Sequence, residues 1–120
     1  MNKKLFGTDG IRSLSSDEIF NNLSLNNLSK AIIKNNKNLK IVIGRDTRES
    51  SKKIENNFTN ALQRSGAKIF KAGLISTPAI AYLTKKLNCN LGIVVSASHN
   101  PYQFNGIKFF NKNGDKLSEL

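Results

Sequence analysis

The amino-acid sequence predicts an α/β domain whose sheet is mainly parallel. Three short apolar runs, at 39–44, 67–72 and 91–95, have the length and composition of buried strands. Between these runs, apolar residues recur at intervals of three and four, the spacing of a helix that buries one face. Strands that alternate with helices of about 10–15 residues are typical of βαβ units with right-handed crossovers.

The first predicted helix precedes the strand at 39–44. Ser24 is its expected N-terminal cap, because a serine side chain accepts a hydrogen bond from the free backbone N–H groups of the first turn. The Asn-rich residues 35–38 are expected to end it. Its apolar face consists of Leu25, Leu28 and Ile32.

Two further helices are predicted after the strands at 39–44 and 67–72. The earlier one is expected to be capped by Ser50 or Ser51 and to stop near Gly66, with an apolar face of Ile54, Phe58, Ala61 and Leu62. The later one is expected to hold Pro78 in its first turn, where proline is tolerated. Its apolar face consists of Ile80, Leu83, Thr84 and Leu87.

Polar segments follow two of the predicted strands directly. Residues 45–48 read Arg-Asp-Thr-Arg, and residues 96–101 read Ser-Ala-Ser-His-Asn-Pro. In parallel sheets, ligands bind beyond the carboxyl ends of the strands. Both segments are therefore expected to reach the same rim and to form a site there.

Ser98, within the second of these loops, has two interpretations. A serine at the end of a sheet, with backbone N–H groups around it, suits a phosphate or an oxyanion. An isolated loop serine more often forms a turn or a cap. Because Ser98 and His99 are adjacent, and adjacent extended residues point apart, a Ser-His-Asp triad is a poor fit. The glycine-rich nucleotide loops are absent.

The composition excludes several classes of protein. A chain of 120 residues is at most one domain, and no apolar run is long enough to cross a bilayer or to serve as a signal peptide. The single cysteine, Cys89, excludes an internal disulfide and suits the cytoplasm. One His and one Cys are too few soft ligands for a structural zinc site.

The net charge of +11 at neutral pH is open to two interpretations. A strongly basic domain can bind nucleic acid or an acidic membrane. Here the basic residues are scattered and most Phe residues lie in apolar segments, so neither partner is expected. The charge can instead steer an anionic substrate towards the protein.

Several motifs, in the same order along the chain, resemble the alpha-D-phosphohexomutase family. Ser-Ala-Ser-His-Asn-Pro at 96–101, followed by Asn-Gly-Ile-Lys at 105–108, resembles the phosphoserine loop of that family. Phe-Gly-Thr-Asp-Gly-Ile-Arg at 6–12 is most similar to its bacterial phosphoglucosamine mutase branch. Gly-Arg-Asp-Thr-Arg at 44–48 and the segment at 76–84 continue a match that covers nearly the whole chain.

The resemblance implies a fold and a reaction. The implied fold is a three-layer α/β/α domain with a mixed, mainly parallel sheet, the first domain of a phosphohexomutase. In the implied reaction, a phosphoserine gives its phosphoryl group to a phosphosugar, and the sugar bisphosphate returns its other phosphate to the serine. For the glucosamine branch this interconverts glucosamine 6-phosphate and glucosamine 1-phosphate, on the route to UDP-N-acetylglucosamine and peptidoglycan. A phosphomannomutase or phosphoglucomutase, or a non-catalytic basic binding module, remains an alternative.

Matching positions imply roles for individual residues. Ser98 matches the phosphoryl carrier, whose oxygen also contacts the Mg²⁺ of the family. Lys108 and Arg12 match cations near the reacting phosphate, and a lysine among other cations can have its pKa lowered enough to act as a base. His99 is expected either to orient or shuttle a proton, or simply to pack the loop. The expected substrate- or phosphate-binding residues are Thr8, Asp9, Ser96 and Asn100.

Other positions are assigned to the scaffold or depart from the family. Arg45, Asp46 and Arg48 are expected to form a structural ion-pair cluster. Ser13 and Ser51 stand where the family commonly has glycine. Because glycine adopts positive φ more readily than serine does, each of the two loops is expected to be slightly altered.

Other functional parts of the family are not found in this sequence. The family holds Mg²⁺ in an Asp-rich loop of a later domain, whereas the aspartates here are widely spaced. The sugar-recognition loop and the distal phosphate-binding loop are missing as well. We therefore expect residues 1–120 to be a first domain, incomplete at its C-terminus and inactive alone. The expected parent is a cytoplasmic enzyme that acts on phosphosugars and can form homo-oligomers.

Overall fold

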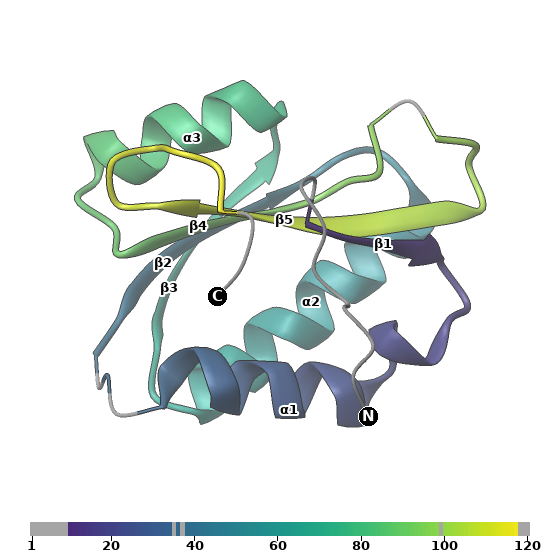
Figure 1. Ribbon diagram of the computed structural model, residues 1–120, viewed down its shortest axis with the longest axis horizontal. Helices are drawn as coiled ribbons and strands as arrows, with labels where there is room; N and C mark the ends of the chain where they lie inside the picture. Colours follow the sequence, from purple (N-terminus) through teal and green to yellow (C-terminus); the bar gives the residue numbers. More distant parts are fainter. Residues whose placement is uncertain (1–9, 35, 37, 99, 118–120) are drawn as a thin grey trace.

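A computed structural model describes residues 10–34, 36, 38–98 and 100–117 of the chain. Within these residues, one sheet has five strands in the order β1-β5-β4-β2-β3 (Figure 1). The strands are β1 (Ile11–Leu14), β2 (Lys40–Arg45), β3 (Lys68–Leu74), β4 (Leu91–Val95) and β5 (Phe104–Asn111).

The sheet is mixed, with most strands running one way. β2 pairs in parallel with both β3 and β4. β5 pairs antiparallel with β4 on one side and with β1 on the other. β1, β2, β3 and β4 therefore share one direction and β5 opposes them. The predicted mixed, mainly parallel sheet is confirmed.

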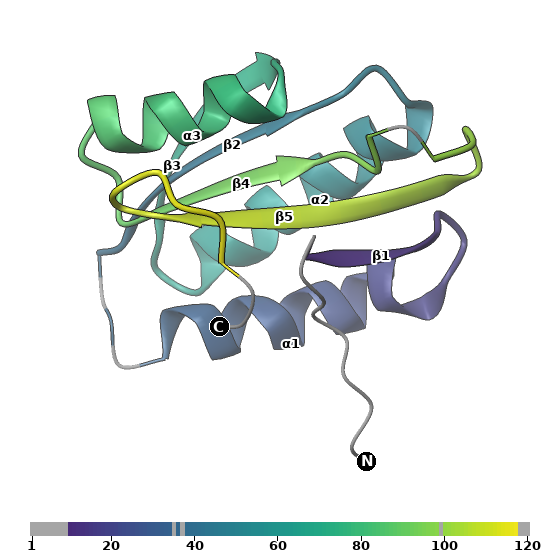
Figure 2. The ribbon, with the colours of Figure 1, turned by 45° about the horizontal axis from the view of Figure 1, so that its top comes forward.

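Helices cover both faces of this sheet. α1 (Asn22–Ile33) and α2 (Glu49–Arg64) pack together on one face, and α3 (Thr77–Lys86) packs on the other (Figures 1 and 2). A 3₁₀ helix at Glu18–Phe20 leads from β1 into α1. These three layers confirm the α/β/α arrangement. None of the helices described is long and apolar enough to span a membrane.

The central strands divide their side chains between two hydrophobic clusters. Ile43 of β2 belongs to the cluster that contains Phe58 of α2. Val42, the residue before it, belongs to the cluster that contains Ile80 of α3. Because successive strand residues point to opposite faces and both faces are covered, β2 and β4 are apolar almost without interruption. That is the pattern that made them recognisable in the sequence.

Two of the predicted helix starts are wrong. α1 is capped by Asn21, whose Oδ1 accepts a hydrogen bond from the backbone N–H of Ser24 at 2.8 Å. Ser24 thus lies within the first turn. α2 follows Arg48, which makes no side-chain cap, and Ser51 is buried within the helix. At α1, several neighbouring Asn and Ser residues can make this hydrogen bond, so packing of the helix on the sheet decides which one does.

The other predicted boundaries are confirmed. Ser76 caps α3, which has Pro78 in its first turn. Gly66 follows the end of α2 with a φ of +107°, in the left-handed region where glycine is favoured. α1 ends at Ile33, just before the Asn-rich segment, although residues 35 and 37 lie outside the described residues. The sequence pattern did not predict two of the strands, β1 and β5. β1 has only four residues, and the apolar run of β5 is broken by buried Asn105 and Lys108.

Candidate active site

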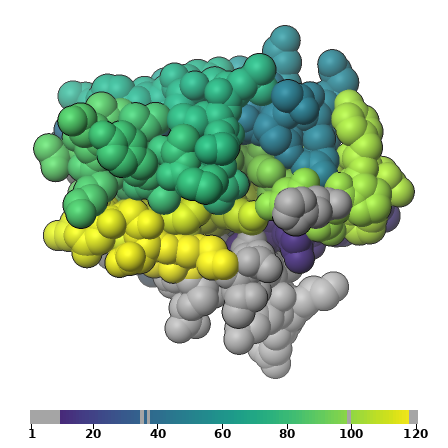
Figure 3. Space-filling model, turned by 90° about the horizontal axis from the view of Figure 1, so that it is seen from above, coloured from purple at the N-terminus to yellow at the C-terminus, as the bar shows by residue number. Residues whose placement is uncertain are grey.

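The loops that follow β2 and β4 lie side by side at one rim of the sheet (Figure 3). They are joined by a hydrogen bond from the backbone N–H of Asp46 to the carbonyl of Val95, at 3.1 Å. The prediction that both loops reach the same rim is confirmed. Together they line a pocket of about 370 Å³, formed by Asp46, Thr47, Arg48, Ser96, Ser98, Asn100 and Tyr102.

Ser98 lies against a lysine that the sheet buries. Lys108 Nζ donates a hydrogen bond to Ser98 Oγ at 2.6 Å, and Lys108 is only 8% exposed. In the antiparallel ladder, Lys108 is the partner of Val94, so β5 returns it to the end of β4 where the Ser98 loop begins. A charged donor at this distance forms a strong hydrogen bond. The ammonium group can therefore stabilise negative charge that develops on the serine oxygen.

The backbone of Ser98 adopts an unusual conformation. Its φ is +53°, in the left-handed region that residues other than glycine rarely adopt. The N–H of Ser98 donates to Ser96 Oγ at 3.0 Å, and the N–H of Asn100 donates to the carbonyl of Ala97 at 3.0 Å. These bonds close a tight turn, and the Ser98 side chain on this turn reaches Lys108.

A close approach of β1 brings Arg12 to the same loop. Arg12 is opposite Gly106 in the ladder between β1 and β5. A Cβ atom at Gly106 would lie 2.7 Å from the carbonyl oxygen of Ile11 and 2.9 Å from that of Ser96, so a larger residue does not fit there. With β1 this close, Arg12 Nη1 donates to Asn100 Oδ1 at 3.0 Å.

Asp46 is the acidic centre of the rim. Burial raises the pKa of its carboxyl group, but other effects together outweigh burial and hold that pKa below its ordinary value. These are the hydrogen bonds from the Ser51 side chain, the Arg48 backbone N–H and the Ser96 side chain, and the charge of Arg48. Asp46 is therefore ionised at neutral pH, and its carboxylate forms an ion pair with the Arg48 guanidinium group.

The expected ion-pair cluster is thus present, but it is divided. Arg48 pairs with Asp46, whereas Arg45 Nε lies 3.7 Å from Glu55 Oε1. Arg45 reaches Asp46 only through its backbone, since Arg45 Nη1 donates to the Asp46 carbonyl at 3.2 Å. Arg48, which is 8% exposed, also extends to the neighbouring loop: its Nη2 donates to the carbonyls of Asn100, at 2.5 Å, and Ser98, at 3.4 Å.

Two residues that the sequence analysis did not select also hold the rim together. Asn105, fully buried on β5, donates from Nδ2 to the Ser51 hydroxyl at 2.8 Å. Tyr102 accepts a hydrogen bond on its hydroxyl from the backbone N–H of Glu49, at 2.9 Å, which ties the Ser98 loop to the start of α2. Asn105 opens the motif at 105–108 and could have been selected on that ground. No pattern in the sequence indicates Tyr102.

The loops at Ser13 and Ser51 are not altered in the way expected. Among the described residues, the only non-glycine residues with positive φ are Asn38, Asn88 and Ser98. Ser13 is an ordinary strand residue, and its hydroxyl donates to Asp17 at 2.6 Å. Ser51 is helical, and its hydroxyl binds the Asp46 carboxylate. Neither serine has a positive φ, so neither position requires glycine.

The structure thus gathers five of the predicted site residues: Arg12, Ser96, Ser98, Asn100 and Lys108. Thr8, Asp9 and His99 lie outside the described residues, and their roles stay predictions. Within the described part of the chain, no group of three or more His, Cys, Asp or Glu side chains is arranged to hold a metal ion. Contact between Ser98 and Mg²⁺ stays a prediction.

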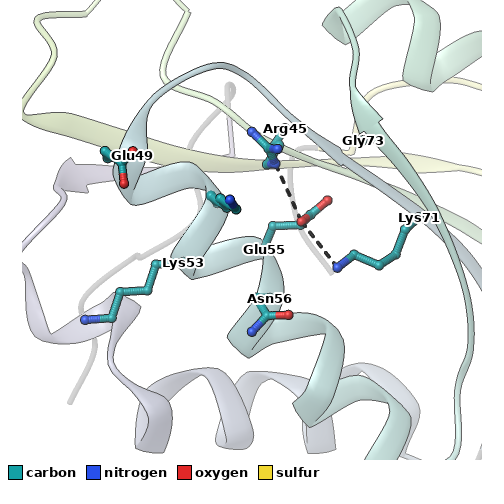
Figure 4. A pocket seen from close by; sticks show the side chains of 8 residues that line it. Arg45, Glu49, Lys53, Glu55, Asn56, Lys71 and Gly73 are labelled. Carbon is teal, nitrogen blue, oxygen red and sulfur yellow. Dashed lines mark ion pairs between the residues drawn. The ribbon is translucent and has the colours of Figure 1, made fainter.

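A larger pocket, of about 510 Å³, lies elsewhere, between α2 and the edge strand β3 (Figure 4). Its centre is Glu55, which is 3% exposed and lies between two cations. Arg45 Nε and Lys71 Nζ are each 3.7 Å from Glu55 Oε1. We attribute this cluster to neutralisation of a buried carboxylate between helix and sheet. Ser98 and Lys108 do not line this pocket.

Known proteins match both the sequence and the fold. Phosphoglucosamine mutases from Alkaliphilus metalliredigens and a Nitratiruptor species are 47% and 48% identical to the chain, over 97% and 95% of its length. The chain spans 27% and 26% of those two proteins. In a putative phosphomannomutase from Thermus thermophilus, 26% of the structure superposes on 93% of this chain, with a TM-score of 0.82 and 28% identity.

A second solved structure agrees on the fold. A phosphoglucomutase/phosphomannomutase family protein from Burkholderia thailandensis matches 96% of this chain, which covers 27% of that protein, with a TM-score of 0.76 and 21% identity. The family model for phosphoglucomutase/phosphomannomutase, alpha/beta/alpha domain I, matches residues 3–119. That match spans nearly the whole chain, including the loops that meet at the rim. The chain therefore belongs to the phosphoglucomutase/phosphomannomutase family, as its alpha/beta/alpha domain I.

Proposed function

We propose that this chain is the phosphoserine-bearing first domain of a phosphoglucosamine mutase, with Ser98 as the phosphoryl carrier. The contact between Lys108 Nζ and Ser98 Oγ at 2.6 Å carries the proposal. It gives the serine oxygen a buried, cationic partner at the carboxyl end of the sheet, where ligands of α/β domains bind. Relatives named phosphoglucosamine mutase, at 47% and 48% identity, support the choice of the glucosamine branch.

In the proposed reaction, a hydroxyl oxygen of the phosphosugar attacks the phosphorus of phosphorylated Ser98. The hydroxyl proton is released to solvent, the bond between phosphorus and Ser98 Oγ breaks, and Lys108 gives a proton to the departing serine oxygen. In the return step, Ser98 Oγ attacks the other phosphate of the sugar bisphosphate and its proton passes to Lys108. The bond between that phosphorus and the sugar oxygen breaks, and the sugar oxygen takes up a proton from solvent. Phosphoryl transfer depends mainly on positioning and on neutralising charge. Arg12 and Lys108 supply positive charge, and Asn100 holds Arg12 in place.

Membership of this family suggests a metal cofactor, and we propose Mg²⁺, which would neutralise phosphate charge when bound. In this chain, an oxygen of Ser98 or of its phosphate is the proposed ligand. The remaining ligands are proposed to come from another domain of the whole protein. That protein is proposed to act in the cytoplasm on glucosamine phosphates, with further domains and a possible homo-oligomeric state, and without a nucleic-acid partner.

Phosphate transfer to Ser98 tests the carrier role. Because the chain alone is expected to be inactive, it replaces the corresponding segment of the Alkaliphilus metalliredigens enzyme. This chimaera is incubated with glucosamine 1,6-bisphosphate and Mg²⁺, and its intact mass is followed over time. We expect the mass of one phosphate group to be added, and none in S98A. S65A, which changes a serine at the end of α2, is the matched control and is expected to take up phosphate as the wild type does. Uptake by S98A equal to that of the wild type excludes Ser98 as the carrier.

A chimaera tests the assignment to the glucosamine branch. The corresponding segment of the Alkaliphilus metalliredigens enzyme is replaced by this chain, and interconversion of glucosamine 6-phosphate and glucosamine 1-phosphate is measured. We expect the chimaera to retain activity and to lose it when it also carries S98A. A folded chimaera that acts on mannose or glucose phosphates but not on glucosamine phosphates would favour the phosphomannomutase or phosphoglucomutase alternative. A chimaera without mutase activity on any of these sugars would favour the non-catalytic alternative.

A further inference from the structure

Arg48 connects the two loops of the rim through a single buried side chain. Nη1 of its guanidinium group contacts the Asp46 carboxylate, and Nη2 contacts the backbone of the Ser98 loop. The Nη2 atom is 2.5 Å from the carbonyl oxygen of Asn100 and 3.4 Å from that of Ser98. These carbonyls lie on either side of residue 99, so a single group holds the turn that presents Ser98 Oγ.

We propose that Arg48 is a positioning residue that holds Ser98 in its left-handed conformation, with the hydroxyl directed at Lys108. The effect of Arg48 on phosphate transfer rests on the proposed function. Its effect on the conformation of Ser98 does not depend on that function. A serine with a φ of +53° is in a conformation that is unfavourable for residues other than glycine, and surrounding contacts must offset its free-energy cost. The hydrogen bond from the Ser98 N–H to Ser96 Oγ and the Arg48 contacts to two carbonyls are the interactions that do so.

The geometry requires a guanidinium group rather than any cation. Nη1 is directed at Asp46 Oδ2 while Nη2 is directed at the Ser98 loop, so two separate sets of acceptors are used at once. The planar fork of arginine can bind both sets from one fixed position. A lysine ammonium at the same place carries its donors on one nitrogen atom. It can keep the ion pair with Asp46 or donate to the carbonyls of the Ser98 loop, but it cannot do both at once.

Asp46 fixes Arg48 in turn and extends the connection to β5. The Asp46 carboxylate binds Arg48 through its guanidinium group and its backbone N–H, the latter at 3.1 Å. The same carboxylate accepts a hydrogen bond from Ser51, which accepts one from Asn105 at 2.8 Å. Asn105 and Lys108 are on the same strand. Ser98 and Lys108 are therefore positioned by one connected set of polar groups, with Arg48 at its centre.

The structural part of the test compares crystal structures of the wild-type chain and R48K. We expect Ser98 to leave the positive-φ region in R48K and Ser98 Oγ to move out of hydrogen-bond distance of Lys108 Nζ. R64A is the matched control, since Arg64, at the other end of α2, donates a hydrogen bond to Asn26 Oδ1 on the exposed surface. Retention of the left-handed Ser98 and of the Lys108 contact in R48K would overturn the inference, whatever the chain does with phosphate.

The functional part measures, in the chimaera with the Alkaliphilus metalliredigens enzyme, phosphate transfer from glucosamine 1,6-bisphosphate to Ser98 at varied bisphosphate concentrations. For R48K we expect the rate at saturation to fall about 10- to 100-fold, the effect of a small misplacement of a reacting group, with little change in the half-saturating concentration. In R48A, millimolar guanidinium is expected to restore part of the rate, whereas ammonium is not. A loss of stability without a change in rate, or a loss of rate that guanidinium does not restore, contradicts a positioning role.

The two parts separate the inference from the proposed function. If wild-type Ser98 accepts no phosphate, the proposed function fails, and the conformation of Ser98 in R48K still decides whether Arg48 holds the turn. If R48A does not fold, R48K supplies both comparisons, because it keeps the positive charge beside Asp46.

Discussion

The contact between Ser98 and Lys108 depends on what each residue's backbone does. Ser98 adopts a positive φ, which turns its side chain away from the direction that an extended residue would take. Lys108 is in regular strand conformation, but the strand runs opposite to its neighbour, so position 108 returns to the level of position 94. Ten residues separate the two in sequence, and 2.6 Å separates their polar atoms. The spacing of the motif does not reveal this contact by itself.

At this scale we predict that K108M abolishes most of the phosphate transfer to Ser98. Methionine keeps the length of the apolar stem but removes the group that handles the proton and the charge. A fall of about 10²- to 10⁴-fold in the rate is expected, the range for loss of a general acid or base. Intact mass over time measures the rate, and K112M, at an exposed position beyond β5, is the control. A rate in K108M within twofold of the wild type would falsify the proposed role.

Asp46 leads to a prediction about pH. Its pKa in the folded chain lies below the ordinary value of 3.8, so the folded state favours the ionised carboxylate. A group with a lowered folded pKa adds stability that is fully present above the unfolded pKa and is lost as the pH falls through the folded pKa. We therefore expect wild type to be more stable than D46N at pH 7, and this difference to shrink below a pH of about 3.8.

Urea unfolding of both proteins at several pH values measures that difference. D17N serves for comparison, since Asp17 caps the 3₁₀ helix at the surface and lies away from the rim. A gap between wild type and D46N that stays constant from neutral to acidic pH would show that the charge of Asp46 is not what stabilises the loops.

Among the elements, β5 has the greatest effect on the site. It lies between β4 and β1, antiparallel to both, and carries Asn105, Gly106 and Lys108 in succession. Each contributes differently: Asn105 binds Ser51, Gly106 admits β1, and Lys108 reaches Ser98. β5 thus buries an amide and an ammonium group among its apolar residues. Burial of these polar groups is tolerated because each has a hydrogen-bond partner in the folded chain.

For helix α1 we predict that replacing Asn21, the observed cap, destabilises the chain more than replacing Ser24, the cap predicted from the sequence. N21A removes the side chain that accepts a hydrogen bond from the Ser24 N–H, and is expected to lower the free energy of unfolding by about 1 kcal/mol. S24A leaves that backbone donor in place and is expected to change stability by less than about 0.5 kcal/mol. Chemical denaturation of the two variants checks this. Equal effects would indicate that Asn21 does not cap the helix.

At the scale of the whole molecule, the described residues form two hydrophobic clusters that share strands. Ile93 and Val95 of β4 belong to the cluster under α1 and α2, whereas Val94 belongs to the cluster under α3. A strand that belongs to both clusters cannot detach from one without exposing the other. The rim at the carboxyl ends of β2 and β4 therefore follows two strands that are buried along most of their length.

This arrangement predicts a single cooperative unfolding transition. F58A, in the larger cluster, is expected to cost about 3–5 kcal/mol, and I80A, in the smaller one, about 2–5 kcal/mol. Both side chains are fully buried. Circular dichroism and an NMR signal from the opposite face are expected to change together in each variant. Separate transitions for the two faces would contradict the shared-strand account.

Much of the architecture could be predicted from periodicity. The strand at 91–95 and the helix with Pro78 in its first turn were placed correctly, because buried strands and proline leave clear local signals. The caps predicted at Ser24 and at Ser50 or Ser51 are wrong. At α1, neighbouring residues are capable of the same hydrogen bond and Asn21 makes it, whereas α2 begins after Arg48 without a side-chain cap. β1 is too short for its pattern to be distinctive.

For the site, local motifs named Ser98, Lys108 and Arg12, and placed the loops after β2 and β4 on one rim. The sequence also led to the expectation that Arg45, Asp46 and Arg48 form a structural ion-pair cluster. Only the tertiary structure decided that Arg48 binds the carbonyls of the Ser98 loop, and that Tyr102 ties this loop to α2. Local composition determines which segments are strands and helices, because the signals lie within a few residues. Contacts between residues that lie about fifty positions apart depend on how the sheet orders its strands, which no local pattern encodes.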